Sequence, residues 1–326
     1  MTKRVATVAL MWMVLGAAPT FGQFRVPDRG LRQTALTGPS DSMLPRVCSP
    51  TSGVAYAVWG DLSEGFAFSA DVWFAKTTNG GTTWTVPVRV DVGNAPGMGF
   101  VDPRWMKIAC DASSNVVVAW RQETAGEYDI YANVTRDGGT TWLARPLRLS
   151  ASAPIGTNSS HHPALCSPGD GSFWAAWVYD NQVKVRLSSD GGATWGTTWT
   201  VNTLTAPAVS DPEDEGSVID LSCLAGKAQV AWRTPTEIWV NSTANSGFTW
   251  RGMSRHDLDA TADGDPNLAV ESGGHLYVTW ASGVGSGDIY FVVSGDAGAT
   301  WGGVHRVDHG AAGVDSMDPH VTGSST

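Results

Sequence analysis

The sequence TTNGGTTW at residues 77–84 decides the fold, because it occurs five times with small variations. The other copies are TRDGGTTW at residues 135–142, SSDGGATW at residues 188–195, TANSGFTW at residues 243–250 and SGDAGATW at residues 294–301. All five follow the pattern [Ser/Thr]-x-[Asp/Asn]-x-Gly-x-Thr-Trp. They begin roughly 50–60 residues apart, a period typical of propeller blades.

Each shared position of this pattern has a physical role. The Asp or Asn side chain accepts hydrogen bonds from backbone N–H groups two residues further on and so closes a turn. The Gly adopts a positive φ, and the Trp offers a large apolar surface that packs the hairpin against a core. We therefore predict structural rather than catalytic roles for Asn79, Gly81, Trp84, Asp137, Gly139, Trp142, Asp190, Gly192, Trp195, Asn245, Gly247, Trp250, Asp296, Gly298 and Trp301.

The repeated phrase resembles the Asp-box, or BNR repeat, of the sialidase-like β-propellers. The resemblance extends over nearly the whole chain after its leader. It implies an all-β propeller of four-stranded antiparallel blades. Asp-boxes occur on sialidases and also on non-enzymatic secreted and surface proteins, so the resemblance leaves the activity open.

The residues around each copy predict four short strands per repeat. In the first repeat these are residues 46–49, 54–59, 71–76 and 86–90. After the fifth repeat, residues 316–321 read SMDPHV and resemble the start of another first strand. We predict five complete blades and part of a sixth; the alternatives are a five-bladed ring with a ragged tail, or a fragment of a longer gene product.

Composition and the N-terminus predict an exported protein. The net charge of −10 argues against nucleic-acid or anionic-membrane partners. Residues 1–22 read as a secretory signal peptide, with Lys3 and Arg4 before an apolar run, and residues 23–326 as the propeller. An uncleaved anchor is the alternative, and no later stretch predicts a membrane span. We expect a secreted, extracellular or periplasmic location.

Four cysteines occupy equivalent places in four successive repeats: Cys48, Cys110, Cys166 and Cys223. Equivalent strands of neighbouring blades are expected to lie further apart than a disulfide can reach. We therefore predict small buried thiols between the blades.

The predicted strand order places the repeated turns on one face of the propeller. The opposite face collects residues before each first strand, after each second strand and before each third strand. Such propeller mouths are common ligand sites. The ligand-binding candidates on this face are Arg121, Arg233, Asp61, Asp102, His162, Tyr179 and Asp265.

The resemblance implies what a sialidase would need there: three arginines for the substrate carboxylate, a Tyr nucleophile activated by Glu, and an Asp acid/base. Arg121 and Arg233 follow the tryptophan of a second strand, but a third arginine is not evident. Phe24-Arg25-Val26-Pro27 matches a family motif close to the leader, whereas Met43 stands at the aligned position of the first blade. Tyr128, after Glu127, and Tyr179 are candidate nucleophiles, and the catalytic residues stay unassigned.

No cofactor is predicted, although two acidic loops leave Ca²⁺ as an alternative to simple solvation. Zinc at His161 and His162 is disfavoured, because adjacent strand residues point to opposite faces. The residues of the two acidic loops are Asp257, Asp259, Asp263 and Asp265, and Asp211, Glu213, Asp214 and Glu215.

The leading interpretation is a secreted propeller that binds a carbohydrate or an extracellular or cell-surface protein without a complete sialidase site. An exo-α-sialidase, a glycoside hydrolase that releases terminal sialic acids, is the first alternative. A structural repeat segment of a larger surface protein is the second.

Overall fold

The computed structural model describes residues 42–61, 71–92, 98–151, 158–203, 218–234, 236–256, 264–282, 287–308 and 319–322. These ranges contain twenty strands. No helix with the length and apolar character of a membrane span occurs in them. The leader, Arg25 and both acidic loops except Asp265 lie outside the described residues.

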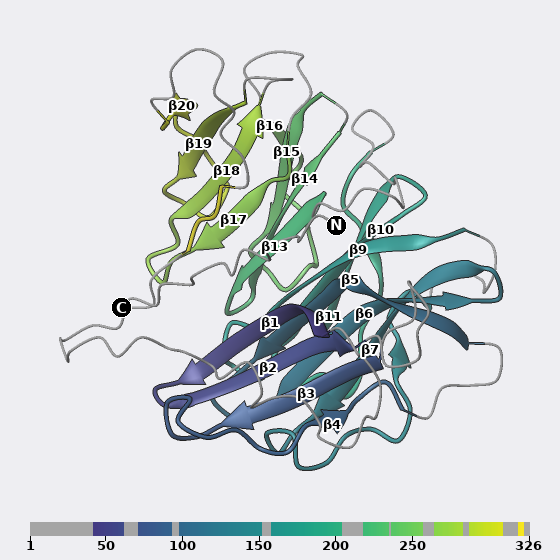
Figure 1. Cartoon of the computed structure of the whole chain (residues 1–326). Coiled ribbons are helices and arrows are strands. Elements are labelled where there is room, and N and C mark those ends of the chain that lie inside the picture. The colour runs from purple at the N-terminus through teal and green to yellow at the C-terminus, as the bar shows by residue number, and fades with distance from the viewer. Residues whose placement is uncertain are drawn as a thin grey trace, which may run out of the picture.

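The strands form five four-stranded antiparallel sheets, each from four consecutive strands in chain order (Figure 1). This confirms the predicted all-β propeller blades. Blade 1 contains β1 (Ser42–Thr51), β2 (Val54–Asp61), β3 (Asp71–Thr77) and β4 (Val88–Arg89). Blade 2 contains β5 (Met98–Cys110), β6 (Val116–Thr124), β7 (Glu127–Thr135) and β8 (Leu147–Arg148). Blade 3 contains β9 (Ser160–Cys166), β10 (Phe173–Tyr179), β11 (Gln182–Ser188) and β12 (Trp199–Thr200). Blade 4 contains β13 (Ile219–Leu224), β14 (Lys227–Arg233), β15 (Ile238–Thr243) and β16 (Ser254–Arg255). Blade 5 contains β17 (Asn267–Val270), β18 (Leu276–Ser282), β19 (Asp288–Ser294) and β20 (His305–Arg306).

The first strands of neighbouring blades lie side by side: β1 contacts β5, β5 contacts β9, β9 contacts β13, and β13 contacts β17. Between blades 4 and 5, the amide of Leu268 donates to Asp220 Oδ2 at 2.8 Å. The amide of Val321 donates in the same way to Asn267 Oδ1 at 2.8 Å. Asp220 and Asn267 occupy equivalent registers in blades 4 and 5. Residues 319–322 therefore occupy the first-strand position of a sixth blade.

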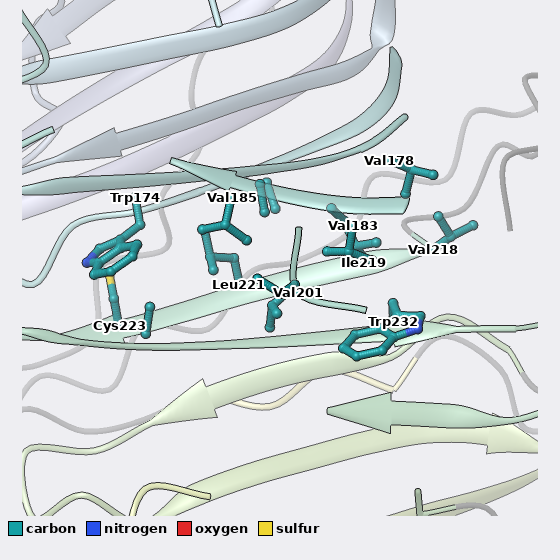
Figure 2. Close-up of a cluster of buried hydrophobic side chains, with 14 residues drawn as sticks. Trp174, Val178, Val183, Val185, Val201, Val218, Ile219, Leu221, Cys223 and Trp232 are labelled. Atoms are coloured by element: carbon teal, nitrogen blue, oxygen red, sulfur yellow. The ribbon is translucent and has the colours of Figure 1, made fainter. Parts of the chain in front are cut away.

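The hydrophobic core is divided among the spaces between blades. One buried cluster lies between each pair of neighbouring blades from blade 1 to blade 5. Figure 2 shows the cluster between blades 3 and 4, where Trp174 and Trp232 lie near its two ends. Both tryptophans are fully buried. A buried tryptophan contributes about 3–5 kcal/mol relative to alanine, so these layers fix each blade against the next.

The repeated turns are held by a fixed set of hydrogen bonds. In blade 2, Asp137 Oδ1 accepts from the amides of Thr140 and Thr141, both at 2.9 Å. The hydroxyl of Thr135 accepts from the amide of Gly139 at 2.9 Å. The amides bonded to the Asp or Asn side chain lie three and four residues on in blades 2 and 5, and four residues on in blades 1, 3 and 4, rather than two as expected. The Ser or Thr at the start of the phrase accepts the bond from the amide two residues after the Asp or Asn.

The turn glycine of blades 2 to 5 lies against the preceding blade. Its φ lies between 83° and 88° in all five turns. A Cβ added at Gly139 would lie 2.2 Å from Phe74 Cε1 of blade 1, and one added at Gly247 would lie 2.6 Å from the Trp199 ring of blade 3. Trp142 meets Phe74 edge-on, with ring centroids 4.9 Å apart. The phrase therefore docks one blade on another as well as closing a hairpin.

Buried polar side chains add a second link between blades. Asn133 on β7 donates to the carbonyl of Val90, after β4, at 2.7 Å. Asn241 on β15 repeats this contact with the carbonyl of Val201, after β12, at 2.7 Å. Each asparagine donates a hydrogen bond to a backbone carbonyl just after the last strand of the preceding blade. That buried carbonyl is therefore not left without a donor.

The prediction of free cysteines is wrong. Cys48 bonds to Cys110 and Cys166 bonds to Cys223, and no free cysteine is found in the described ranges. The expectation rested on the width of a blade, but the cysteines lie at the ends of first strands, which converge. Their Cα atoms are 6.2 Å and 6.0 Å apart, within disulfide reach. The bonds join blade 1 to blade 2 and blade 3 to blade 4.

Candidate functional site

We call the mouth the edge of the blades where first strands begin, second strands end and third strands begin. In blade 1 this edge aligns Ser42, Asp61 and Asp71 on neighbouring strands. The repeated turns follow the third strands and lie at the opposite ends. The mouth therefore brings together side chains from every blade, away from the turns.

A polar cluster at the mouth is centred on Arg121, which directly follows the buried Trp120 on β6. Its guanidinium forms an ion pair with Asp102 of β5 and a 2.8 Å hydrogen bond with His161 Nδ1 of β9. All three side chains are buried, with Arg121 only 1% exposed. Removing one partner of such a pair would leave an uncompensated buried charge, at a cost of about 3–5 kcal/mol.

The hydrogen bond between Arg121 and His161 determines which ring nitrogen of a neutral His161 carries the proton. Every N–H of a guanidinium donates and none accepts. Nδ1 of His161 must therefore be the acceptor, so it carries no proton. A neutral His161 in this state has its proton on Nε2.

Aromatic rings enclose the Arg121 guanidinium. Its central carbon lies 4.2 Å from the ring centroid of Tyr128 and 5.4 Å from that of Trp105. The Trp105 ring also meets His162 edge-on, with centroids 4.1 Å apart. A bulge in β5 places Trp105 here, because β5 has four residues opposite a single residue of β6 between Asp102 and Lys107. The cluster thus joins Arg121, Asp102 and His162 of the sequence candidates.

A second pair of candidates lies between blades 4 and 5. Arg233 Nε donates to Asp265 Oδ1 at 2.9 Å. Their side chains are 16% and 31% exposed, so this pair is accessible to solvent where the Arg121 pair is not. Each arginine follows a second-strand tryptophan and reaches the next blade. Arg121 contacts His161 at the start of β9, and Arg233 contacts Asp265 just before β17.

The remaining candidates lie elsewhere on the mouth. Asp61 is buried in blade 1 and accepts a 3.3 Å hydrogen bond from Ser42. Tyr179 ends β10, where it faces Ser160 and Gln182 and packs partly against the core between blades 2 and 3.

Sequence reasoning missed a ring of equivalent positions on the first strands, which are polar except for Ala164 of blade 3. Arg46, Lys107, Ala164, Asp220 and Asn267 each face the residue just before the second-strand tryptophan of their blade. His320 completes the series, because Val321 bonds Asn267 as Leu268 bonds Asp220. Aligning the first strands of the repeats on their second-strand tryptophans could have identified these positions.

This ring, which we call the axial ring, carries coupled charges. Burial lowers the pKa of the Lys107 ammonium, while Asp220 opposes that shift. Burial raises the pKa of the Asp220 carboxyl, against the Lys107 charge and two backbone N–H groups. The charges of Lys107 in blade 2 and Asp220 in blade 4 therefore stabilise each other.

The described residues contain no group of three or more His, Cys, Asp or Glu side chains suited to a metal ion. His161 bonds Arg121 through Nδ1, and the rings of His161 and His162 lie 6.1 Å apart at their centroids. The calcium alternative concerned loops outside the described ranges and stays a prediction.

The mouth of the described chain is thus built from arginine–aspartate pairs and aromatic rings. Arg121 and Arg233 lie in separate clusters, each paired with an aspartate. A cluster of three arginines around a ligand carboxylate is not assembled from these residues. The arrangement offers fixed hydrogen-bond donors and acceptors together with ring faces.

Comparisons with known proteins give the same architecture. No family model matches the sequence, and no curated protein matches it significantly. The structure is similar to that of Hadza microbial sialidase Hz136, with a TM-score of 0.52 and 16% identity over 82% of this chain and 59% of the sialidase. It is also similar to the α-L-arabinofuranosidase Arb93A of Fusarium graminearum in complex with an iminosugar inhibitor. That TM-score is 0.51, with 12% identity over 86% of this chain and 82% of the enzyme.

At these identities the likeness shows the fold alone. The chain spans less than two thirds of the sialidase's own length. Together with the five four-stranded blades, the comparisons show that the chain has the fold of the sialidase-like β-propellers.

Proposed function

We propose that this chain is an exported carbohydrate-binding propeller that lacks a complete sialidase site. The observation that supports this proposal is the pairing of each candidate arginine with an aspartate of the protein itself. A ligand carboxylate at either guanidinium would meet the negative charge of Asp102 or Asp265, and it would have to displace that aspartate to take over its hydrogen bond. At the buried Arg121 pair that exchange would leave the aspartate charge uncompensated.

The same pairs suit the hydroxyl groups of a sugar. A hydroxyl donates one hydrogen bond and accepts others, so it can bridge a guanidinium N–H and a carboxylate oxygen without breaking the pair. Arg233 and Asp265 are partly exposed and are the pair that a ligand would reach. The buried Arg121 cluster would act as the support behind the mouth.

Two further observations favour export. The leader at residues 1–22 has the pattern of a secretory signal. The two disulfides between blades fit an oxidising compartment, since such bonds are rare in reducing ones. Both fit a protein that meets glycans outside the cytosol.

Binding to immobilised neutral and acidic glycans tests the proposal. Asp265→Asn is expected to weaken binding about tenfold, because it removes the charge that orients Arg233. Arg255→Ala is the matched control, since Arg255 on the outer strand β16 pairs at 2.9 Å with Glu237, just before β15, and is 46% exposed. Equal binding by the Asp265 variant and the native chain, or absence of any glycan binding by the folded protein, would contradict the proposal.

A sialidase remains the competing function. It predicts hydrolysis of a fluorogenic sialoside that is lost in Arg233→Ala, whereas the proposed binding function predicts none.

A further inference from the structure

The hairpin between the second and third strands of blade 2 extends beyond the mouth. β6 continues four residues past its tryptophan, to Thr124, whereas the second strands of the other blades end one or two residues past theirs in the described ranges. Ala125 and Gly126 close the hairpin with φ values of 56° and 87°, as in a tight type I′ turn. Two additional residues lengthen a strand by about 7 Å. We call residues 123–128 the blade 2 tip.

One side of the blade 2 tip faces blade 3. Glu123 lies directly opposite Tyr128, two residues along each strand from the opposing residues Arg121 and Ile130. These four side chains therefore share one face of the sheet. Ile130 packs in the core cluster between blades 2 and 3, so the shared face is turned toward blade 3.

Contacts with two blades hold the blade 2 tip in place. The hydroxyl of Ser159, just before β9 of blade 3, accepts a hydrogen bond from the amide of Tyr128 at 3.0 Å and donates one to Glu127. The Arg121 guanidinium covers one face of the Tyr128 ring, with its central carbon 4.2 Å from the ring centroid. A ring fixed in this way loses little conformational freedom when a ligand binds to it.

Two polar groups of this face are open to a ligand. In the part of the chain that the structure describes, no hydrogen bond or ion pair joins the Glu123 carboxylate or the Tyr128 hydroxyl to another group. Both residues are partly exposed, and neither group is a buried atom without a partner. The carboxylate accepts hydrogen bonds, whereas the phenolic hydroxyl both donates and accepts them. Beside an aromatic ring, such groups form the mixed apolar and polar surface that small-molecule sites use.

We propose that Tyr128 and Glu123 form a second saccharide subsite, which takes a neutral sugar residue of an oligosaccharide. This inference rests on the proposed carbohydrate-binding function and extends it from the pair of Arg233 and Asp265 to the blade 2 tip. The first subsite lies between blades 4 and 5, whereas the blade 2 tip faces blade 3. A ligand that occupies both subsites must therefore be an oligosaccharide rather than a single sugar.

The chemistry of the blade 2 tip determines the kind of sugar. The apolar face of a sugar ring would stack on the face of Tyr128 that Arg121 leaves open, and its hydroxyls would donate to Glu123. A sugar carboxylate would instead be repelled by Glu123 and Glu127. The Arg121 charge does not offset this repulsion, because it is already paired with Asp102. The subsite therefore favours a neutral sugar.

Binding of fluorophore-labelled tetrasaccharides to the full-length protein tests the subsite. The probes are β-1,4-linked chains of glucose, mannose, galactose or xylose, with tetragalacturonate as the acidic counterpart. For the neutral chain that binds most tightly, we expect Tyr128→Ala to weaken binding about tenfold or more. Tyr128→Phe keeps the ring and is expected to weaken it only about threefold. Glu123→Gln is expected to narrow the preference for that chain over tetragalacturonate.

Tyr277→Ala is the matched control, because Tyr277 is also partly exposed on a second strand but lies three residues before Trp280, toward the repeated turns. Equal affinity of Tyr128→Ala and Tyr277→Ala would overturn the second subsite, and loss of binding by Asp265→Asn in the same assay would leave the proposed function standing. Absence of binding to every glycan would contradict both.

Circular dichroism melts show whether each variant is folded. If Tyr128→Ala unfolds, Tyr128→Phe and Glu123→Gln replace it, and unchanged affinity of both for the best neutral chain would overturn the subsite. Tighter binding of tetragalacturonate than of every neutral chain by the native protein would overturn the assignment of a neutral sugar.

Discussion

Replacing Gly139 by alanine tests whether the repeated turn holds blades together or only closes a hairpin. Its φ of 86° is unfavourable for alanine, and the added Cβ would lie 2.2 Å from Cε1 and 2.6 Å from Cζ of Phe74. Phe74 is 1% exposed, so its ring has no room to move aside. Gly126 is the matched control, because its φ is 87° in the same blade and a Cβ there meets nothing within 4 Å.

Alanine at a positive φ destabilises the folded state by about 1–2 kcal/mol, and this cost is common to both substitutions. Overpacking against Phe74 adds about 1–3 kcal/mol for Gly139→Ala alone. Urea unfolding followed by tryptophan fluorescence measures both, with the midpoint as the comparison. Adding Phe74→Leu to Gly139→Ala should recover part of the difference. Equal losses of stability for the Gly126 and Gly139 variants would refute the view that the turn is seated on the preceding blade.

Three further predictions concern the same links between blades. Replacing Cys48 and Cys110 by serine should lower the free energy of unfolding by about 4 kcal/mol, because the bond joins residues 62 apart; a loss below about 1 kcal/mol in urea unfolding would contradict this. Asp137→Asn should flatten the fall of stability between about pH 5 and pH 2. The Thr141 hydroxyl and amide hold the pKa of Asp137 far below its unfolded value, so its stabilisation is present above that value and lost as pH falls. The urea midpoints at pH 6 and pH 3 measure this, and an unchanged difference between them would refute it. Asn133→Ala should cost about 1–3 kcal/mol by leaving a buried carbonyl without a donor, and hydrogen exchange should then rise at the boundary of blades 1 and 2.

The repeat architecture was predictable because its signals are local. A turn needs a glycine at positive φ and an oxygen acceptor nearby, and both are visible in eight residues. The prediction of a further first strand near the end of the sequence is supported at residues 319–322, since the amide of Val321 bonds Asn267 as Leu268 bonds Asp220. The eight-residue pattern does not show which residue of the neighbouring blade each turn contacts. That Gly139 meets Phe74 depends on packing between segments about 65 residues apart in the chain.

The disulfide error has the same origin. Cysteines at one repeat position look equally spaced along the chain, but first strands converge and bring Cys48 within 6.2 Å of Cys110. The sequence indicated which residues lie at the mouth, but it did not show which of them form pairs. Arg233 follows a second-strand tryptophan, which marks its place, whereas its contact with Asp265 crosses between two blades.

The axial ring escaped notice for a different reason. Lys107 and Asp220 are different residue types within β5 and β13, so no repeated sequence pattern marks their shared position. Only the strand register shows that they occupy equivalent places in blades 2 and 4.

The most direct test of the proposed function is to incubate the purified, folded protein with a fluorogenic sialoside and, in parallel, with immobilised glycans. The proposal predicts no turnover, together with glycan binding that Asp265→Asn weakens and Arg255→Ala does not. Turnover that Arg233→Ala abolishes would contradict it and would place Arg233 in a working sialidase site.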